Sequence, residues 1–129
     1  MKYTLITILF LLTFGVNTFA VMPPAITGKA SWYSAHDKTD PFAHVRNADG
    51  SKFNENAYTC AMRSRVFGKR YKVTNLRNGR SIVVTHRDYG PARRYKGRQL
   101  NRVIDLSKAA FTAIADLGEG VIFVRVEEA

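Results

Sequence analysis

Asp88 has the residue type and the surroundings that proton-transfer chemistry requires. It ends an apolar run that begins at Val83, and it stands just before a turn at Gly90 and Pro91. A carboxyl group can protonate a leaving group, or it can stabilise a developing positive charge when it is ionised. The alternative is structural, because aspartate often accepts backbone N–H bonds within its own turn.

Three further polar residues are candidates for supporting Asp88. The alternation of side chains along a β-strand places His86 on the same face as Asp88. Asp49 lies in a turn with Gly50, and Asp105 precedes a predicted helix whose free N–H groups it could cap. Each has a structural alternative, which for His86 is a partly buried side chain with one nitrogen hydrogen-bonded.

Aromatic and basic side chains lie close to these candidates in the sequence. Tyr33 and Tyr89 could stack on sugar rings, whereas Trp32 is expected to pack inside the protein. The segment around Asp88 is strongly basic, and its cations could bind carboxylates or phosphates or could simply be solvated; they are Arg87, Arg93, Arg94, Lys96, Arg98 and Arg102. Nearby cations also favour the ionised form of a carboxyl group and so oppose its use as an acid.

The sequence predicts neither a metal nor a cofactor. The three histidines, His36, His44 and His86, show no metal-ligand spacing with carboxylates or with Cys60. Because Cys60 is the only cysteine, an intrachain disulfide is excluded. Cys60 and Met62 are predicted to be core residues of a strand, and nothing in the sequence places a histidine beside the thiol to activate it.

The amino-terminal segment indicates export. Lys2 precedes an apolar run, and Thr18 and Ala20 are small residues at the positions that a signal peptidase reads. We therefore expect residues 1–20 to be a cleaved signal peptide, residues 21–27 an extended leader and residues 28–129 a single domain. No cysteine stands at the junction to carry a lipid, so the mature protein is expected to be unanchored in the periplasm or cell envelope.

The charge balance indicates an anionic partner. The 129 residues include 20 Lys and Arg against 10 Asp and Glu, which is a formal net charge of +10. Such a surface favours polyanions. For an exported protein these are cell-wall polymers or lipid head groups. Nucleic acid is not expected, because the basic residues are spread along the chain and no recognition motif is present.

Short strands are expected to position the candidate residues. Two runs rich in β-branched residues flank Asn78 and Gly79, and this dipeptide predicts a β-hairpin with a type I′ turn. Further strands are expected at residues 29–34 and 120–128, where small, aromatic and β-branched residues dominate.

One short amphipathic helix is also expected. Apolar residues recur at helical spacing from Leu106 to Leu117, with Ser107 as the N-cap and Gly118 as the residue that ends the helix. Many short strands and one helix in about a hundred residues favour a small, closed or nearly closed, mainly-β barrel.

Five segments, read together, carry a resemblance to a known family. They are "GKASWYS", "ADGSKFN", "TCAMRSRVFGKRYKVTNLRNGRSIVV", "RDYGP" and "VIDLSKAAFTAIADLGEG". Their order and spacing resemble the rare lipoprotein A family of bacterial septal-ring lytic transglycosylases. The resemblance covers nearly the whole chain after the predicted signal peptide, and it implies a six-stranded double-psi β-barrel.

The resemblance also implies a peptidoglycan substrate that is cut without water. In this chemistry a carboxyl group protonates the glycosidic oxygen, and the C6 hydroxyl of the sugar attacks C1 to leave a 1,6-anhydro-muramyl end. Asp88 matches the acidic residue of the family's Asp-Arg-Gly-Pro motif, with Tyr89 in place of the arginine. It is therefore expected to act as the general acid or, if ionised, as the stabiliser of the developing cation.

Two positions depart from the family pattern. Ser51 stands where the family usually has glutamate, and Met62 stands where it usually has histidine. These departures favour a different class, a non-catalytic wall-binding or wall-loosening module similar to expansins, whereas the "RDYGP" and "IDLS" segments favour the transglycosylase. An inhibitor or protein-binding barrel is a third alternative. Expected partners are peptidoglycan glycan strands, with anionic wall polymers and division proteins as further candidates.

Overall fold

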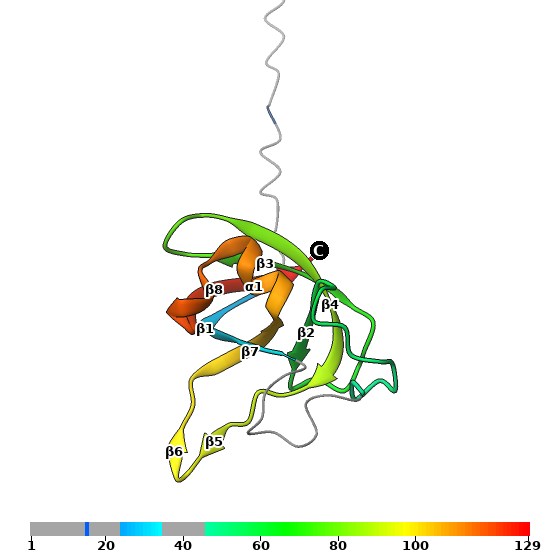
Figure 1. Cartoon of the computed structure of the whole chain (residues 1–129). Coiled ribbons are helices and arrows are strands. Elements are labelled where there is room, and N and C mark those ends of the chain that lie inside the picture. Colours follow the sequence, from blue (N-terminus) through cyan, green and yellow to red (C-terminus); the bar gives the residue numbers. More distant parts are fainter. Residues whose placement is uncertain (1–14, 16–23, 35–45) are drawn as a thin grey trace, which may run out of the picture.

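A closed barrel of six strands forms the centre of the computed structural model, which describes residues 15, 24–34 and 46–129 (Figure 1). Around the barrel the strand order is β1-β7-β2-β4-β3-β8. These strands are β1 Ala25–Tyr33, β2 Thr59–Met62, β3 Arg70–Asn75, β4 Ser81–Tyr89, β7 Arg102–Ser107 and β8 Val121–Glu128. The predicted mainly-β barrel with one short helix is confirmed.

The predicted signal peptide, apart from Gly15, lies outside the described residues, as do His36 and His44.

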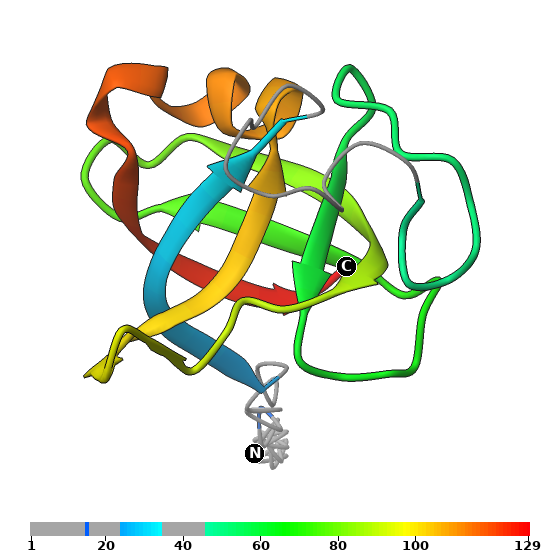
Figure 2. The ribbon, with the colours of Figure 1, turned by 60° about the horizontal axis from the view of Figure 1, so that its bottom comes forward.

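Two parallel strand pairs join segments that are far apart in the chain. β1 runs parallel to β7 and β2 runs parallel to β4, whereas the other barrel neighbours are antiparallel. Figure 2 shows β1 and β7 side by side in the barrel wall, with the helix at one end of the barrel. β1 begins at Ala25, where it pairs with Glu127 of β8. The barrel therefore includes residues 25–27 of the predicted leader.

The barrel interior is filled by apolar side chains from all six strands and the helix. Burying each large aliphatic or aromatic side chain stabilises the fold by about 1.5–3 kcal/mol before entropy is counted. Trp32 packs against this cluster, as expected, and its Nε1 donates a hydrogen bond to the carbonyl oxygen of Leu117 at 3.2 Å. Cys60 and Met62 are core residues of β2, also as expected. The largest completely buried apolar side chains are Phe111, Ile104, Leu106, Ile114, Val73, Val84 and Val124.

The predicted β3–β4 hairpin is present, but its turn is not of type I′. Gly79 has a positive φ of 74°, whereas Asn78 does not have the positive φ that such a turn requires. The backbone N–H of Gly79 donates to the Asn75 carbonyl at 2.8 Å, which closes a longer loop. The side chains of Asn75 and Asn78 both donate to the carbonyl oxygen of Ile114, at 2.8 and 2.9 Å. The loop is therefore shaped by its attachment to the end of the helix.

The helix α1 is shorter than predicted and spans Lys108–Ile114. Ser107 caps it as expected, because its side chain accepts a hydrogen bond from the N–H of Ala110 at 3.3 Å. Leu106, which fits the helical spacing, belongs instead to β7, where it pairs with Trp32 and Cys60. The chain turns extended after Ile114, and Gly118 lies inside the following 3₁₀ helix, η1 Leu117–Glu119.

Part of the basic segment forms a small hairpin of its own. Its two strands are β5 Arg94–Tyr95 and β6 Arg98–Gln99, and it projects from the barrel in Figure 1. The connecting residues Lys96 and Gly97 both have positive φ, 46° and 77°. The hairpin carries several of the predicted binding cations away from the barrel wall.

Gly28 allows β1 and β7 to approach each other closely. A Cβ atom added at Gly28 would lie 2.5 Å from Cγ1 of Val103. We expect Gly28→Ala to destabilise the barrel by about 1–3 kcal/mol, the usual cost of overpacking. Val103→Ala removes the clashing methyl groups, so the double variant should lose less than the sum of the two single variants. Urea unfolding of the four proteins measures this coupling, and strictly additive losses would contradict it.

Candidate functional site

Four residues form a row across neighbouring strands on the outer side of the barrel wall. Ser31 of β1 pairs with Asp105 of β7. Ala61 of β2 pairs with Asp105 on one side and with Asp88 of β4 on the other. Because adjacent strands lie about 4.8 Å apart, the Cα atoms of the two aspartates are roughly 10 Å apart. This row, with one small side chain between two carboxyl groups, is the candidate functional site.

Asp88 is anchored through one carboxylate oxygen and open at the other. Its Oδ1 accepts hydrogen bonds from the backbone N–H groups of Ala48 and Tyr89, each at 2.9 Å. Within the described part of the chain, Oδ2 has no hydrogen bond. The bond from Tyr89 is the turn interaction expected of a structural aspartate. Among the described residues, therefore, nothing occupies Oδ2 of this anchored carboxyl group, and that oxygen could act on a ligand.

The arginine next to Asp88 is directed to a different carboxylate. Nη1 of Arg87 lies 3.2 Å from Oδ2 of Asp49, and the backbone N–H of Asp49 donates to the Arg87 carbonyl at 3.1 Å. Slight burial raises the pKa of Asp49, but hydrogen bonds from Ser51 and the charge of Arg87 outweigh it and hold the pKa below its ordinary value. Asp49 therefore contacts Arg87, the neighbour of Asp88 in β4, rather than Asp88 itself. Arg87 is ion-paired with Asp49 and not with Asp88.

The prediction that His86 and Asp88 share a face of β4 is wrong. Cys60 pairs with His86, but the next residue of β2, Ala61, pairs with Asp88, so that Arg87 is an extra residue in β4. A β-bulge of this kind shifts the alternation of side chains by one residue. His86 consequently points into the core, where it is completely buried, while Asp88 faces outwards.

His86 supports the site through the backbone. Its Nε2 lies 2.9 Å from the carbonyl oxygen of Asp88 and 3.3 Å from that of Met62. Its Nδ1 lies 3.2 Å from the carbonyl oxygen of Val66, and its ring packs against Phe67 with centroids 5.1 Å apart. From inside the barrel the imidazole thus holds the end of β4, the segment that carries Asp88.

Replacing His86 with phenylalanine should destabilise the barrel by about 2–4 kcal/mol. The new ring keeps most of the volume, but it removes the ring N–H that the carbonyl oxygen of Asp88 contacts at 2.9 Å, and an unsatisfied buried group costs about 1–3 kcal/mol. The free energy of urea unfolding measures the loss. A change of less than about 0.5 kcal/mol, which is typical of surface substitutions, would show that the imidazole does not hold this segment.

Asp105 is the second carboxyl group of the row, and its side chain is only 19% exposed. The hydroxyl of Ser31 donates to Oδ1, and Nη1 of Arg102 lies 3.8 Å from the same oxygen. Burial raises the pKa of Asp105, the negative charge of Asp88 adds to the rise, and Ser31 and Arg102 counteract it. The net direction favours the protonated form. Asp105 does not cap α1, because Ser107 does.

Gly90 leaves one side of Asp105 uncovered. Its φ is 144°, in a region that side-chain-bearing residues rarely adopt. A Cβ atom added here would lie 4.0 Å from Oδ2 of Asp105 and 3.9 Å from Cβ of Ala61. A side chain at this position would therefore begin in contact with the row, and glycine keeps that space free.

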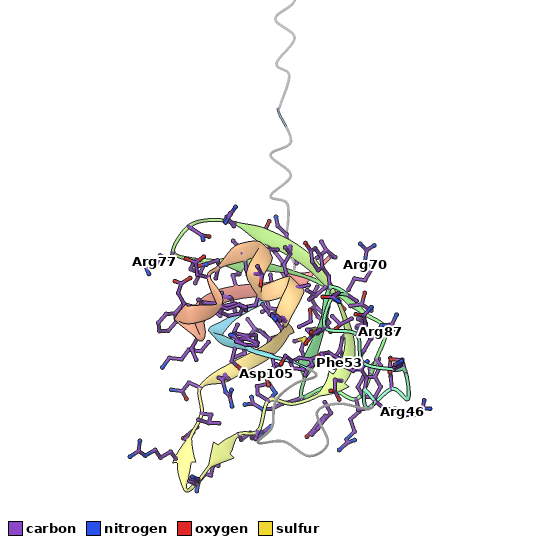
Figure 3. The ribbon with its side chains drawn as sticks, viewed as in Figure 1. Arg46, Phe53, Arg70, Arg77, Arg87 and Asp105 are labelled. Atoms are coloured by element: carbon purple, nitrogen blue, oxygen red, sulfur yellow. The ribbon has the colours of Figure 1, made fainter. Side chains whose placement is uncertain are left out.

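Tyr33 forms an aromatic border at one end of the row. Its ring stacks on Phe53, with centroids 4.8 Å apart and an interplanar angle of 29°. Tyr33 follows Ser31 by two residues in β1 and so lies on the same face of the strand. Burial raises the pKa of Tyr33, and the charges of Asp88 and Asp105 raise it further. Figure 3 shows Phe53 in the loop before β2 and Asp105 on β7. That Tyr33 stacks on sugar rings stays a prediction.

Arginines lie along one side of the row. Arg63 donates from Nε to the Pro91 carbonyl at 3.1 Å and from Nη2 to the Arg102 carbonyl at 2.8 Å. Arg102 donates from Nη1 to the hydroxyl of Ser31 at 2.8 Å. Arg63 and Arg93 line a pocket of about 270 Å³ together with residues 89–92, and both also line a neighbouring pocket of about 370 Å³ with Arg102.

The predicted substrate-binding residues are brought together only in part. Tyr89 is 47% exposed, and the guanidinium of Arg65 lies 4.1 Å from its ring centroid. Arg94 lies in β5 on the small hairpin and lines neither arginine-bordered pocket. The residues that border the row are Tyr33, Tyr89 and Arg93, and those that do not are Arg87 and Arg94.

Other chemistries find little support in the described residues. Cys60 pairs with His86 across β2 and β4, but burial raises the pKa of its thiol to about 12, so the reactive thiolate is not formed near neutral pH. No group of three His, Cys, Asp or Glu side chains in the described part could hold a metal ion. Among the same residues, no helix has the length and apolar character needed to span a membrane.

A comparison with known protein families gives a match that covers the barrel. A family model described as "Lytic transglycolase" matches residues 25–126, a range that runs from the start of β1 into β8. The chain belongs to the lytic transglycolase family. Its closed six-stranded barrel is accordingly the double-psi β-barrel that the sequence resemblance implied.

Curated relatives of this lytic transglycolase barrel are considerably longer proteins. The probable endolytic peptidoglycan transglycosylase RlpA of Nostoc sp. is 46% identical over 100 residues, which cover 78% of this chain and 24% of the relative. The protein of the same name from Synechocystis sp. is 46% identical over 109 residues, covering 82% and 30%. The endolytic peptidoglycan transglycosylase RlpA of Neisseria meningitidis serogroup A is 33% identical over 102 residues, covering 79% and 38%. The chain thus spans well under half the length of these relatives.

Solved structures share the fold of the lytic transglycolase barrel at low sequence identity. A Streptomyces papain inhibitor superposes with a TM-score of 0.61 at 24% identity, over 82% of this chain and 94% of that chain. The expansin of Clavibacter michiganensis superposes with a TM-score of 0.59 at 19% identity, over 82% and 50%. At these identities the likeness concerns the fold alone.

Ser31 of the row and two residues beside it, Phe53 and Arg63, were not identified from the sequence. Ser31 holds Asp105, Phe53 supports Tyr33, and Arg63 lines the pockets. Arg63 follows Ala61 by two residues, a spacing that places both on one face of an extended chain. This spacing becomes informative only when Ala61 is known to belong to the row.

The two departures from the usual family pattern are also in this region. Ser51 is hydrogen-bonded to Asp49, and Met62 is buried at the end of β2.

Proposed function

We propose that this protein is an exported lytic transglycosylase that cleaves peptidoglycan glycan strands with Asp88 as its catalytic carboxyl group. The observation that carries the proposal is the row in which Asp88 and Asp105 face the same side of the barrel across Ala61. Membership of the lytic transglycolase family supports the reaction class. The substrate class rests on relatives that are named endolytic peptidoglycan transglycosylases.

In the proposed reaction Asp88 protonates the glycosidic oxygen. Its Oδ1 is fixed by two backbone N–H groups, and Oδ2 is left to face the scissile bond. As the bond breaks, the sugar ring gains oxocarbenium character, and its own C6 hydroxyl attacks C1. The carboxylate left on Asp88 then accepts the proton that the C6 hydroxyl loses, so the step balances without a water and without a second carboxylate acting as a base. Asp105, held by Ser31 and Arg102, contributes negative charge that stabilises the cationic ring when it is ionised.

The aromatic side chains at the row suit a saccharide. Tyr33 stacked on Phe53 offers a flat apolar surface at one end, and the exposed ring of Tyr89 stands next to Asp88. Such faces pack against the C–H faces of pyranose rings. A glycan strand lying across the row would place its glycosidic bond between these aromatic surfaces, within reach of Asp88.

The alternative function is that of a non-catalytic wall-binding module. The observation that favours it is the pair of departures at Ser51 and Met62, which remove two polar groups that the family usually carries beside the aspartate. In this alternative Asp88 accepts hydrogen bonds from sugar hydroxyls, and the arginines hold the polymer by charge.

We further propose that the protein works in the periplasm or cell envelope after removal of residues 1–20. Lys2, the apolar run and the small residues before Val21 support this proposal. The full chain has a net charge of +10, of which Lys2 contributes one, and this charge suits anionic wall polymers as additional partners; division proteins are a further candidate.

Turnover distinguishes the two functions. Purified sacculi are incubated with the protein from Val21 onwards, and both soluble fragments and sedimented protein are measured over time. A transglycosylase releases fragments in amounts that grow with time and exceed the amount of protein. A wall-binding module sediments with the sacculi and releases none, and that outcome, from protein shown to be folded, would overturn the proposed activity.

A further inference from the structure

A pocket beside the row gathers cationic side chains without an acidic one. It measures about 370 Å³, and none of the residues that line it is Asp or Glu. Six of them carry the argument: Arg63, Arg93, Arg102, Gln99, Asn101 and Thr27. We call this feature the arginine pocket. It combines three positive charges with neutral polar side chains.

Two of these arginines are held in place by the barrel. Arg63 is fixed by the carbonyl oxygens of Pro91 and Arg102, and Arg102 is fixed by the hydroxyl of Ser31. In the described part of the chain, Nη1 of Arg63 has no hydrogen bond, and Nε of Arg102 is buried without a partner. Guanidinium groups that are already positioned lose little side-chain entropy when they bind a ligand.

The third arginine carries a charge that nothing in the described part of the chain balances. Arg93 lines the arginine pocket and also the smaller pocket next to Tyr89, and its side chain has no hydrogen bond or ion pair with a described residue. Asp105 lies 3.8 Å from Arg102 and also interacts electrostatically with Arg63, so it offsets part of those two charges. Like charges brought together in a concave site repel, and a bound anion relieves that repulsion.

The arginine pocket is continuous with the proposed catalytic row. Arg63 and Arg93 also line the smaller pocket, which contains Gly90. Gly90 in turn lies beside Oδ2 of Asp105. A polymer lying across the row can therefore reach the arginine pocket with a neighbouring group while its scissile bond stays at Asp88.

We propose that the arginine pocket is an oxyanion subsite that takes a carboxylate or phosphate group of the envelope polymer bound at the row. The planar fork of a guanidinium group matches both anions through paired N–H···O bonds. That the anion belongs to an envelope polymer depends on the proposed function. That the pocket binds an oxyanion depends only on the residues that line it.

Titration with simple anions tests the pocket directly. Isotope-labelled protein is titrated with sodium phosphate and with sodium acetate at constant ionic strength, and backbone amide shifts are followed by NMR. We expect saturable shifts at residues 99–103 and at Arg63. Arg93→Ala should weaken binding at least about fivefold, the loss of roughly one charge-assisted hydrogen bond.

Arg94→Ala is the matched control. It removes the same charge one residue away, from a side chain on β5 that does not line the arginine pocket. Its anion affinity should equal that of the wild type. Shifts that fail to saturate, or equal losses in the two variants, would mean non-specific charge attraction and would overturn the subsite.

Chemically modified polymers identify the source of the anion. Binding of Asp88→Asn protein, with and without Arg93→Ala, is compared on glycan before and after amidation of its carboxylates, and on phosphate-bearing wall polymer before and after phosphate removal. The effect of Arg93→Ala should vanish when the recognised group is removed. If neither treatment changes it, the polymer assignment is wrong. If the wild-type protein does not cleave sacculi but still binds phosphate in the arginine pocket, the proposed function is removed and the subsite remains.

Discussion

Asp88→Asn is expected to lower the rate of glycan cleavage by roughly 10²- to 10⁴-fold, the usual contribution of a general acid. Asparagine has nearly the same shape, and its side-chain oxygen can still accept the hydrogen bonds from Ala48 and Tyr89. It has no acidic proton to give to the glycosidic oxygen. The rate at which soluble fragments leave sacculi measures the effect.

Asp116→Asn is a suitable control for this variant. Asp116 is an exposed aspartate at the start of η1, away from the row, and asparagine is an equally good capping residue. Both variants should keep the thermal midpoint and sacculus affinity of the wild type, and only Asp88→Asn should lose activity. Equal cleavage by Asp88→Asn and wild type would remove Asp88 from the reaction and leave it as a turn residue.

Asp105→Asn is expected to lower activity by roughly 10- to 100-fold and to change its pH dependence. Asparagine keeps an acceptor for the Ser31 hydroxyl, but it cannot ionise to stabilise the cationic ring. Because burial raises the pKa of Asp105, the wild type gains this stabilisation as the pH rises through the raised value. The ratio of the wild-type rate to the Asp105→Asn rate should therefore grow from acidic to neutral pH. A ratio that is the same at every pH would indicate a purely structural role.

The same substitution has a predictable effect on stability. Because burial raises the pKa of Asp105 in the folded state, its contribution to stability is fully present below the ordinary carboxyl value of 3.8 and is lost as the pH rises through the raised value. The wild type should therefore lose stability relative to Asp105→Asn between acidic and neutral pH. Asp49, whose pKa is lowered, has the opposite dependence, but it is common to both proteins. Urea midpoints measured across this range test the trend, and a difference that does not vary with pH would contradict it.

The strands could be predicted from the sequence because their signals are local. The β3–β4 hairpin follows from β-branched runs around Asn78 and Gly79, and the helix start follows from Ser107. The errors occur where tertiary contacts decide. Leu106 fits a helical period, but pairing with β1 and β2 holds it in a strand. The turn at Asn78 depends on a hydrogen bond to Ile114, which no local pattern reveals.

The candidate site could be predicted only in part, for a similar reason. Asp88, Asp105 and Tyr33 were identified from the sequence, mainly through the family resemblance. Their arrangement depends on parallel pairing between distant strands and on the bulge at Arg87, which reverses the expected face of Asp88. The alternation of side chains along β4 does not reveal that Arg87 is an extra residue. The bulge is recognised only from the pairing of β4 with β2.

The most direct test of the central claim is mass spectrometry of the soluble products when sacculi are digested in ¹⁸O-labelled water. If Asp88 promotes attack by the sugar's own hydroxyl, wild-type protein releases fragments with 1,6-anhydro-muramyl ends. These are lighter by one water than hydrolysis products and carry no ¹⁸O, and Asp88→Asn releases almost none. Reducing ends that carry ¹⁸O, or no fragments at all from folded protein bound to the sacculi, would contradict this account.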